Sequence, residues 1–178
     1  MENRKLLIRI VPYIAIVLAA VVARVIPHAP NFAPIGALAI FTGYHFKNKL
    51  AWLFPISAMV ISDFIIGLHS TIPYVYVSFI IMSLVGSAIK NNKSRTLFAT
   101  SLVSSLVFFL ITNFGVWATG TMYIKTQEGL MQSYAMGIPF FRNTVFSDLF
   151  YIFSFFYGYE HINNIARVKL LKYKPPQA

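Results

Sequence analysis

The sequence has no cysteine and few charged residues, and both absences restrict what the chain can be. Without cysteine, disulfides, thiolate metal sites and cysteine nucleophiles are all excluded. Charged residues make up 11% of the chain, with 15 basic against 5 acidic side chains, whereas globular proteins carry about a quarter. Apolar residues make up 57%. This composition favours a membrane protein over a soluble domain.

Recognisable catalytic motifs are also missing. The sequence contains no His-Glu-x-x-His, no Gly-x-Ser-x-Gly, no P-loop and no nucleotide-binding glycine pattern. The four histidines (His28, His45, His69 and His161) share no ligand spacing. We therefore expect no enzyme activity, no metal and no cofactor. Any process driven by ATP would need a partner protein, because the chain lacks a P-loop.

Six apolar segments divide the chain. A membrane-spanning helix needs about twenty residues to cross a hydrocarbon core of about 30 Å, so six spans leave no room for a soluble domain in 178 residues. We expect a single all-α integral membrane domain over 1–178, with an outer loop at 119–140 and a basic cytoplasmic tail at 161–178. The expected spans are 7–26, 32–46, 50–68, 73–89, 96–118 and 141–160.

The basic residues are distributed unevenly over this pattern. Membrane insertion leaves Lys and Arg on the cytoplasmic side. Only Arg24, Lys125 and Arg142 flank the odd-numbered gaps. The termini and the even-numbered gaps hold the other twelve: Arg4, Lys5, Arg9, Lys47, Lys49, Lys90, Lys93, Arg95, Arg167, Lys169, Lys172 and Lys174. The bias predicts a six-transmembrane-helix bundle in the cell membrane with both termini in the cytoplasm.

Two acids fall inside the expected spans, where a charge requires a partner or a function. Asp63 and Asp148 lie in the outer half by helical rise, as do Arg24 and Arg142. One interpretation is a pair of structural ion bridges, Arg24 with Asp63 and Arg142 with Asp148. The other is that the same groups border a ligand pocket, and the sequence leaves both interpretations open.

Other polar and aromatic side chains are predicted at the same depth. Asn113 and Trp117 share one helical face, as do Asp148 and Tyr151. For Tyr74 and Tyr123, an interfacial aromatic belt is the alternative explanation. The candidate substrate-binding residues are Asn31, Tyr74, Asn113, Trp117, Tyr123, Arg142, Asn143, Asp148 and Tyr151.

The first span carries a stripe of small residues. Ala15, Ala19 and Ala23 follow one another at four-residue spacing, which allows another helix to approach closely. The stripe serves either packing within the bundle or docking of an external membrane partner.

Several stretches between about 24 and 144 resemble a known family. They are Arg24-Val-Ile-Pro, Pro30-Asn-Phe-Ala-Pro-Ile-Gly-Ala-Leu-Ala, Ser62-Asp63, Phe108-Phe-Leu-Ile-Thr-Asn-Phe-Gly-Val-Trp and Gly137-Ile-Pro-Phe-Phe-Arg-Asn-Thr. With six helices and about 180 residues, the chain is similar to the S components of energy-coupling-factor (ECF) transporters. It more closely resembles an uncharacterised bacterial family of transport proteins related to them.

This resemblance implies a vitamin or similar micronutrient bound beneath outer loops. It also implies a partner transmembrane subunit and two cytoplasmic ATPases, with Ala15, Ala19 and Ala23 as the docking face. A cysteine that can ligate cobalt in one cobalamin-type member has no counterpart here.

The leading hypothesis is therefore a membrane-embedded substrate-binding subunit for uptake of a vitamin-like molecule. A membrane enzyme acting on a lipid is a second hypothesis, with Asp63 or Asp148 as the acid–base group and Arg142 on a lipid phosphate. A structural or assembly subunit without a ligand is a third. The sequence gives neither the substrate nor the oligomeric state.

Overall fold

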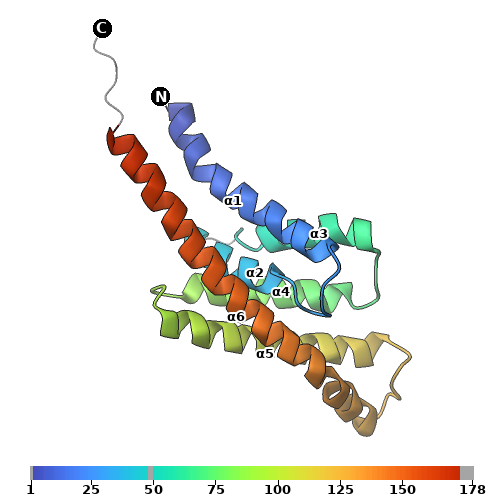
Figure 1. Ribbon diagram of the computed structural model, residues 1–178. Helices are drawn as coiled ribbons and strands as arrows, with labels where there is room; N and C mark the ends of the chain where they lie inside the picture. Colours follow the sequence, from blue (N-terminus) through green and yellow to red (C-terminus); the bar gives the residue numbers. More distant parts are fainter. Residues whose placement is uncertain (1, 48–49, 173–178) are drawn as a thin grey trace.

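The computed structural model describes the backbone of residues 2–47 and 50–172 and the side chains of 13–47 and 50–165. This part of the chain forms six helices and no strand, as the sequence predicts (Figure 1). The helices are α1 (Glu2–Val25), α2 (Ile35–Phe46), α3 (Leu53–Ile66), α4 (Ile72–Ala88), α5 (Ser94–Thr119) and α6 (Gln127–Lys172).

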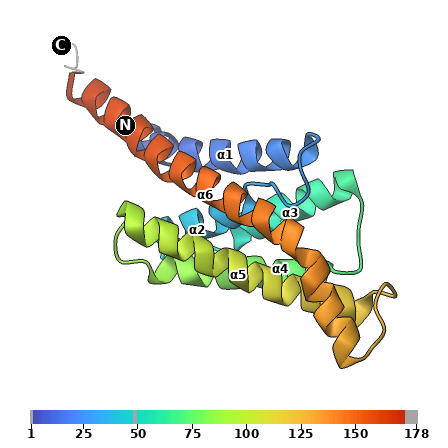
Figure 2. The same ribbon diagram turned by 60° about the horizontal axis from the view of Figure 1, so that its bottom comes forward.

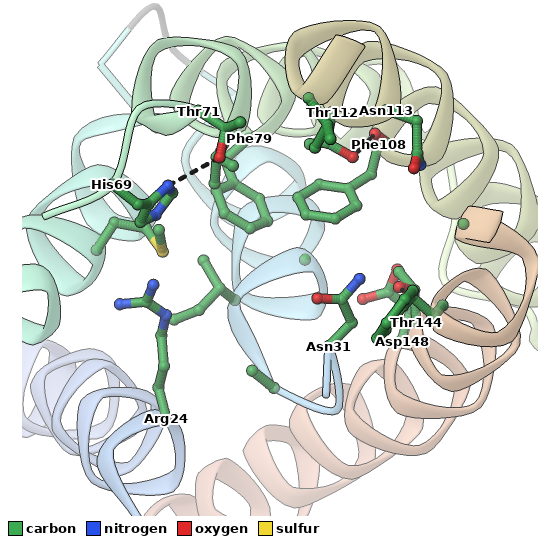
Figure 3. A pocket seen from close by; sticks show the side chains of 18 of the residues that line it. Arg24, Asn31, His69, Thr71, Phe79, Phe108, Thr112, Asn113, Thr144 and Asp148 are labelled. Carbon is green, nitrogen blue, oxygen red and sulfur yellow. Dashed lines mark hydrogen bonds between the residues drawn. The ribbon is translucent and has the colours of Figure 1, made fainter. Parts of the chain in front are cut away.

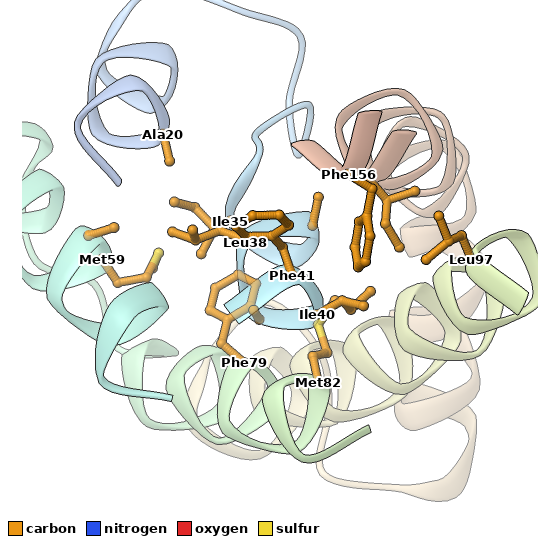
Figure 4. Packing of buried hydrophobic residues seen from close by; sticks show 14 of the residues in the cluster. Ala20, Ile35, Leu38, Ile40, Phe41, Met59, Phe79, Met82, Leu97 and Phe156 are labelled. Atoms are coloured by element: carbon orange, nitrogen blue, oxygen red, sulfur yellow. The ribbon is translucent and has the colours of Figure 1, made fainter. Parts of the chain in front are cut away.

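Helix α2 is the centre of the bundle. Its residues from Ile35 to Gly43 are all buried, which requires apolar or small side chains on every face of the helix. Phe41 is enclosed completely and meets Phe156 of α6 edge to face, with ring centroids 5.3 Å apart. Figure 4 shows side chains from the other five helices surrounding α2: Ala20, Met59, Phe79, Met82, Leu97 and Phe156.

Two glycines bring α2 and α4 into backbone contact. A Cβ at Gly43 would overlap the Ser83 carbonyl, and a Cβ at Gly86 would overlap the Ile40 carbonyl. Small residues at a helix interface allow such an approach and replace side-chain packing with backbone packing. The α2–α4 pair therefore forms the tight part of the bundle.

The helices alternate in direction, so the connections gather at two ends. Figures 1 and 2 both show the start of α1, the end of α6 and the connection 89–93 at one end, and α2 ends and α3 begins at that end as well. The connections 26–34, 67–71 and 120–126 lie at the opposite end. We call these the inner and outer ends.

The basic residues follow this division where the structure describes them. Lys47, Lys90 and Lys93 belong to the inner connections, and Arg95 opens α5 there. Lys125 belongs to an outer connection, and Arg24 lies in the last turn of α1. The side chains of the remaining inner-end basic residues lie outside the described ones: Arg4, Lys5, Arg9, Lys49, Arg167, Lys169, Lys172 and Lys174.

The expected outer loop at 119–140 differs most from the structure. It is a short connection over 120–126, after which α6 begins and runs without interruption past the expected span to Lys172. The Thr126 hydroxyl accepts the Gly129 N–H at 3.2 Å and so caps the new helix. Pro139 lies inside α6. Proline has no backbone N–H, so it cannot donate a helical hydrogen bond at this position.

One helix of the described residues, α5, is long and apolar enough by length and composition to cross a membrane. The apolar stretches Tyr13–Val25, Ile35–Phe46, Leu53–Ile66 and Ile72–Ala88 are shorter than that test requires. Length and composition alone therefore assign a single candidate span.

Candidate functional site

A cavity of about 570 Å³ opens at the outer end of the bundle. All six helices and all three outer connections contribute to its lining, so residues far apart in the sequence meet there (Figure 3). The lining combines apolar side chains with a few polar ones, which is the usual make-up of a small-molecule site.

Asp148 of α6 lies at one side of this cavity. It is 2% exposed, and Ser105 of α5 donates a hydrogen bond to its Oδ2 at 2.7 Å. Gly36 of α2 makes room for the carboxyl group, because a Cβ at position 36 would overlap Asp148 Oδ1. No basic side chain of the described residues forms an ion pair with Asp148. Oδ1, the other carboxyl oxygen, lies beside Gly36, which also lines the cavity.

The opposite side holds a second acid, and this one is paired. Arg24 Nη2 lies 2.7 Å from Asp63 Oδ1, which makes the contact an ion pair. Tyr76 donates to Asp63 Oδ2 at 2.9 Å, and Arg24 Nη1 also donates to Ser62. The Arg24–Asp63 pair proposed from the sequence is thus present and joins α1 to α3.

Aromatic rings form part of the cavity wall. Phe79 of α4 and Phe108 of α5 lie side by side, with centroids 5.2 Å apart, and point into the hollow (Figure 3). Asn113 lines the wall one turn further along α5, and its amide N–H donates to the Phe109 carbonyl at 2.8 Å. The Asn113 carbonyl oxygen lies against Gly137 of α6, where a Cβ would not fit.

Four of the nine predicted binding residues line the cavity: Asn31, Asn113, Tyr123 and Asp148. Asn31 is in the outer connection with a positive φ of 60°, a conformation that asparagine tolerates better than most residues. Figure 3 shows its amide directed toward the part of the cavity that holds Asp148. Residues from four separate segments are thus brought to one hollow.

The other five predicted residues do not line it: four of them contact neighbouring elements instead, and Arg142 is exposed. Tyr74 packs on Gly115 of α5, and half-buried Trp117 donates to the Ile124 carbonyl at 3.0 Å. Arg142 is exposed and forms no ion pair with Asp148, so this proposed bridge is wrong.

Asn143 instead donates to the Pro30 carbonyl at 3.0 Å and ties the 26–34 connection to α6. Tyr151 packs against Phe32, with ring centroids 5.9 Å apart. Both residues support the cavity from outside.

A stripe along α6 was missed by the sequence reasoning. Ser133, Gly137, Phe140, Thr144 and Asp148 all line the cavity at intervals of three or four residues, so they share one helical face. The spacing is visible in the sequence, but treating 119–140 as a loop hides its first half. Phe79, Phe108, Thr112, His28, His69 and Thr71 are further lining residues outside the predicted set.

The connection over 120–126 is held in place from both sides. Lys125 donates to the Gly120 carbonyl at 2.6 Å and to the Trp117 carbonyl, which are acceptors at the C-terminal end of α5. Its ammonium also lies 5.7 Å from the centre of the Trp117 ring. At the start of α6, hydrogen bonds from its own backbone N–H and from Thr126 keep the pKa of Glu128 below its usual range. These contacts hold the 120–126 connection, which lines the cavity through Met122 and Tyr123, and we call it the braced turn.

The small-residue stripe of α1 lies mostly on the outside. Ala15 and Ala19 are exposed and Ala23 is half-buried, whereas Ala20 and Val21 face the core. Ile14, Leu18 and Val22 continue the same outward surface. Packing inside the bundle thus uses a different face from the one that carries Ala15 and Ala19.

The fold and the cavity define an all-helical bundle with a ligand-sized hollow at one end. The chain belongs to a family of unknown function, DUF6580, whose pattern matches residues 4–171. The comparison with curated proteins gave no match, and neither did the comparison with solved structures. Among the described residues, no group of three or more His, Asp and Glu side chains is placed to hold a metal ion.

Proposed function

We propose that the chain is a membrane-embedded binding subunit for the uptake of a vitamin-like small molecule. In this proposal it spans the bacterial cell membrane six times, with both termini in the cytoplasm and the cavity open to the outside. Partner proteins, a transmembrane subunit and two ATPases as in the ECF transporters that it resembles, supply the energy. The observation that carries the proposal is the outer cavity with its incompletely paired Asp148.

The surface of α5 supports a lipid environment. Phe98, Leu102, Leu106, Leu110 and Phe114 are all exposed and recur at every fourth residue, which makes one continuous apolar stripe. On the opposite face, Ser101, Ser104 and Ser105 are completely buried. Polar groups inside and apolar groups outside reverse the soluble pattern and fit a helix surrounded by lipid.

The same reversal extends to the other helices. Exposed large apolar side chains also occur on α1, α3 and α6, with Phe64 of α3 reaching 78% exposure. Monomeric soluble proteins rarely expose contiguous apolar surfaces of this kind. In the most apolar window of α5, 22% of the residues are buried, and in this proposal most of the remainder faces lipid.

The short helix α2 is compatible with a position inside the membrane because the other helices enclose it. Helix α2 has 12 residues, about 18 Å at the usual rise, which is less than the hydrocarbon thickness. It is enclosed by the other helices, and backbone that ends within the membrane is tolerated where protein or a cavity surrounds it. The clustering of basic residues at the inner end favours the orientation.

The arrangement of the cavity favours binding over the alternatives. The lipid-acting enzyme considered from the sequence, with Asp63 or Asp148 as acid–base group, uses Arg142 to hold the lipid phosphate, and Arg142 does not line the cavity. A subunit without a ligand would have its outer polar groups paired internally, and Asp148 has a single hydroxyl partner among the described residues. The exposed Ala15 and Ala19 offer a face to a membrane partner.

Mass spectrometry of small molecules that co-purify with the detergent-solubilised protein tests the proposal. We expect one bound compound with an aromatic ring, enriched over a mock purification from cells lacking the protein. The double variant N113A/D148A should lose it, whereas E128Q, on the exposed start of α6, should retain it. Equal recovery from both variants would refute the site, and recovery of no compound from any of them would refute the function.

A further inference from the structure

The charge balance of the cavity identifies what kind of ligand it accepts. Arg24, His28, His69 and Asp148 are the ionisable side chains along its lining apart from Tyr123. Arg24 is already matched by Asp63. Figure 3 places Arg24 and His69 across the cavity from Asp148. The edge around Asp148 therefore carries an acid with no cation beside it.

The hydrogen bonds of Ser105 also leave Asp148 incompletely paired. Its hydroxyl has one hydrogen, and two acceptors lie within reach: the Ser101 carbonyl at 2.9 Å and Asp148 Oδ2 at 2.7 Å. One hydrogen cannot satisfy both acceptors fully, so Ser105 leaves the Asp148 carboxyl group short of a donor. An ionised Asp148 would compete with the Ser101 carbonyl for that single hydrogen.

Asp148 Oδ1 occupies the space beside Gly36. Gly36 gives the carboxyl its room, and a Cβ there would also come within 2.8 Å of the Met82 methyl group. Asn31 and Thr144 line the same part of the cavity and supply polar groups of no net charge. A buried carboxylate without a counter-charge is expensive, so a cation that arrives with the ligand would be bound strongly.

The aromatic wall sets the shape of the rest of the ligand. Phe79 and Phe108 form a ring pair in the cavity, and Tyr123 and Phe140 also line it. Aromatic side chains favour stacked or edge-to-face contacts with a flat ring, and their faces also attract cations. The wall and the acid together fit a planar group that ends in a positively charged nitrogen.

We infer that the ligand is a flat aromatic molecule with a cationic nitrogen, an amidinium or a protonated amine, that pairs with Asp148. This inference rests on the proposed function, since it names the substrate class of the same cavity. The cation supplies the positive charge that the side chains around Asp148 lack. A carboxylate or phosphate at this edge would meet an acid rather than a base.

Three probes of one shape and different charge test the inference: benzamidine (cationic), benzamide (neutral) and benzoate (anionic). Dissociation constants are measured for the full-length purified protein by ligand-observed NMR. We expect benzamidine to bind at least about tenfold more tightly than benzoate, a difference of about 1.4 kcal/mol. Benzamide should fall between them.

The variant D148N has a neutral side chain of nearly the same shape that still accepts from Ser105. In this variant we expect benzamidine to lose its advantage over benzamide, whereas E128Q should keep it. Thermal unfolding without any probe checks that both variants are folded. The order of affinities of the three probes is measured on the wild-type protein and does not depend on either variant.

The outcomes separate the two proposals. Equal affinity for all three probes, unchanged in D148N, would overturn the charge preference and leave a binding cavity in place. Tighter binding of benzoate would overturn it as well. If none of the probes binds and no compound co-purifies, both the ligand class and the proposed function are refuted.

Discussion

On the side of the cavity formed by α1, α3 and α4, Asp63 is held by the Arg24 guanidinium and the Tyr76 hydroxyl. On the side formed by α2, α5 and α6, Asp148 is equally buried, and its described partner is the Ser105 hydroxyl. The first acid is part of the framework, since its charge is neutralised and it connects three helices. The second is free to respond to what enters the cavity. Two acids of similar depth thus have different roles because of their partners.

The strongest way to test this contrast is to remove the cation from the paired side. R24Q would leave Asp63 buried without a counter-charge, which costs about 3–5 kcal/mol of stability. Thermal or denaturant unfolding in detergent measures the loss. The double variant R24Q/D63N removes both charges and should recover most of it. If R24Q alone is as stable as the wild type, the pair has no structural role.

The space around the unpaired acid is tested next. G36A places a methyl group where Asp148 Oδ1 lies, so we expect a loss of about 1–3 kcal/mol from overpacking. G158A is the matched control, because a Cβ at Gly158 of α6 meets nothing within 4 Å. Unfolding midpoints of the two variants are compared. An equal response at both positions would contradict the close approach of α2 and α6.

The braced turn above the cavity should contribute less. K125M removes the hydrogen bonds to the Gly120 and Trp117 carbonyls, and we expect a loss of about 1 kcal/mol. Limited proteolysis should cut the 120–126 connection faster in this variant. K125R retains a donor and should behave like the wild type. Unchanged cleavage in K125M would show that the turn is held by other contacts.

The smallest effect on stability is expected at Asp148 itself. D148N keeps an acceptor for Ser105 and breaks no ion pair, so the change should be below about 1 kcal/mol. Calorimetric or fluorescence-detected unfolding measures it beside R24Q. A loss as large as that of R24Q would mean that Asp148 is a framework residue as well.

The alternation of the helices and the gathering of polar groups at the outer end follow from patterns visible in the sequence. Helical rise placed Arg24, Asp63, Arg142 and Asp148 in the outer half, and of these four Arg24 and Asp148 line the cavity. Their convergence is a consequence of regular spacing, which a single sequence reveals well.

The positions of the other predicted site residues and the start of α6 depend on contacts that sequence periodicity does not indicate. Asn143 and Tyr74 have the residue types of a binding site, yet a carbonyl at Pro30 and a glycine at 115 decide where they lie. The first turns of α6 were missed because 119–140 was expected to be an outer loop between two apolar segments, although Thr126 provided a capping signal. Side-chain contacts between distant segments are therefore the part that sequence patterns could not supply.

The central claim is that the cavity opens on the outside of a membrane, opposite the basic connections. The chain has no cysteine, so single cysteines can be introduced and labelled without background. Met122 is 77% exposed beside the cavity, and Asn91 is exposed in the inner connection between α4 and α5. With a membrane-impermeant maleimide on intact cells, we predict that M122C is labelled at once and N91C only after the cells are broken. Labelling of N91C in intact cells, with M122C protected, would contradict the account.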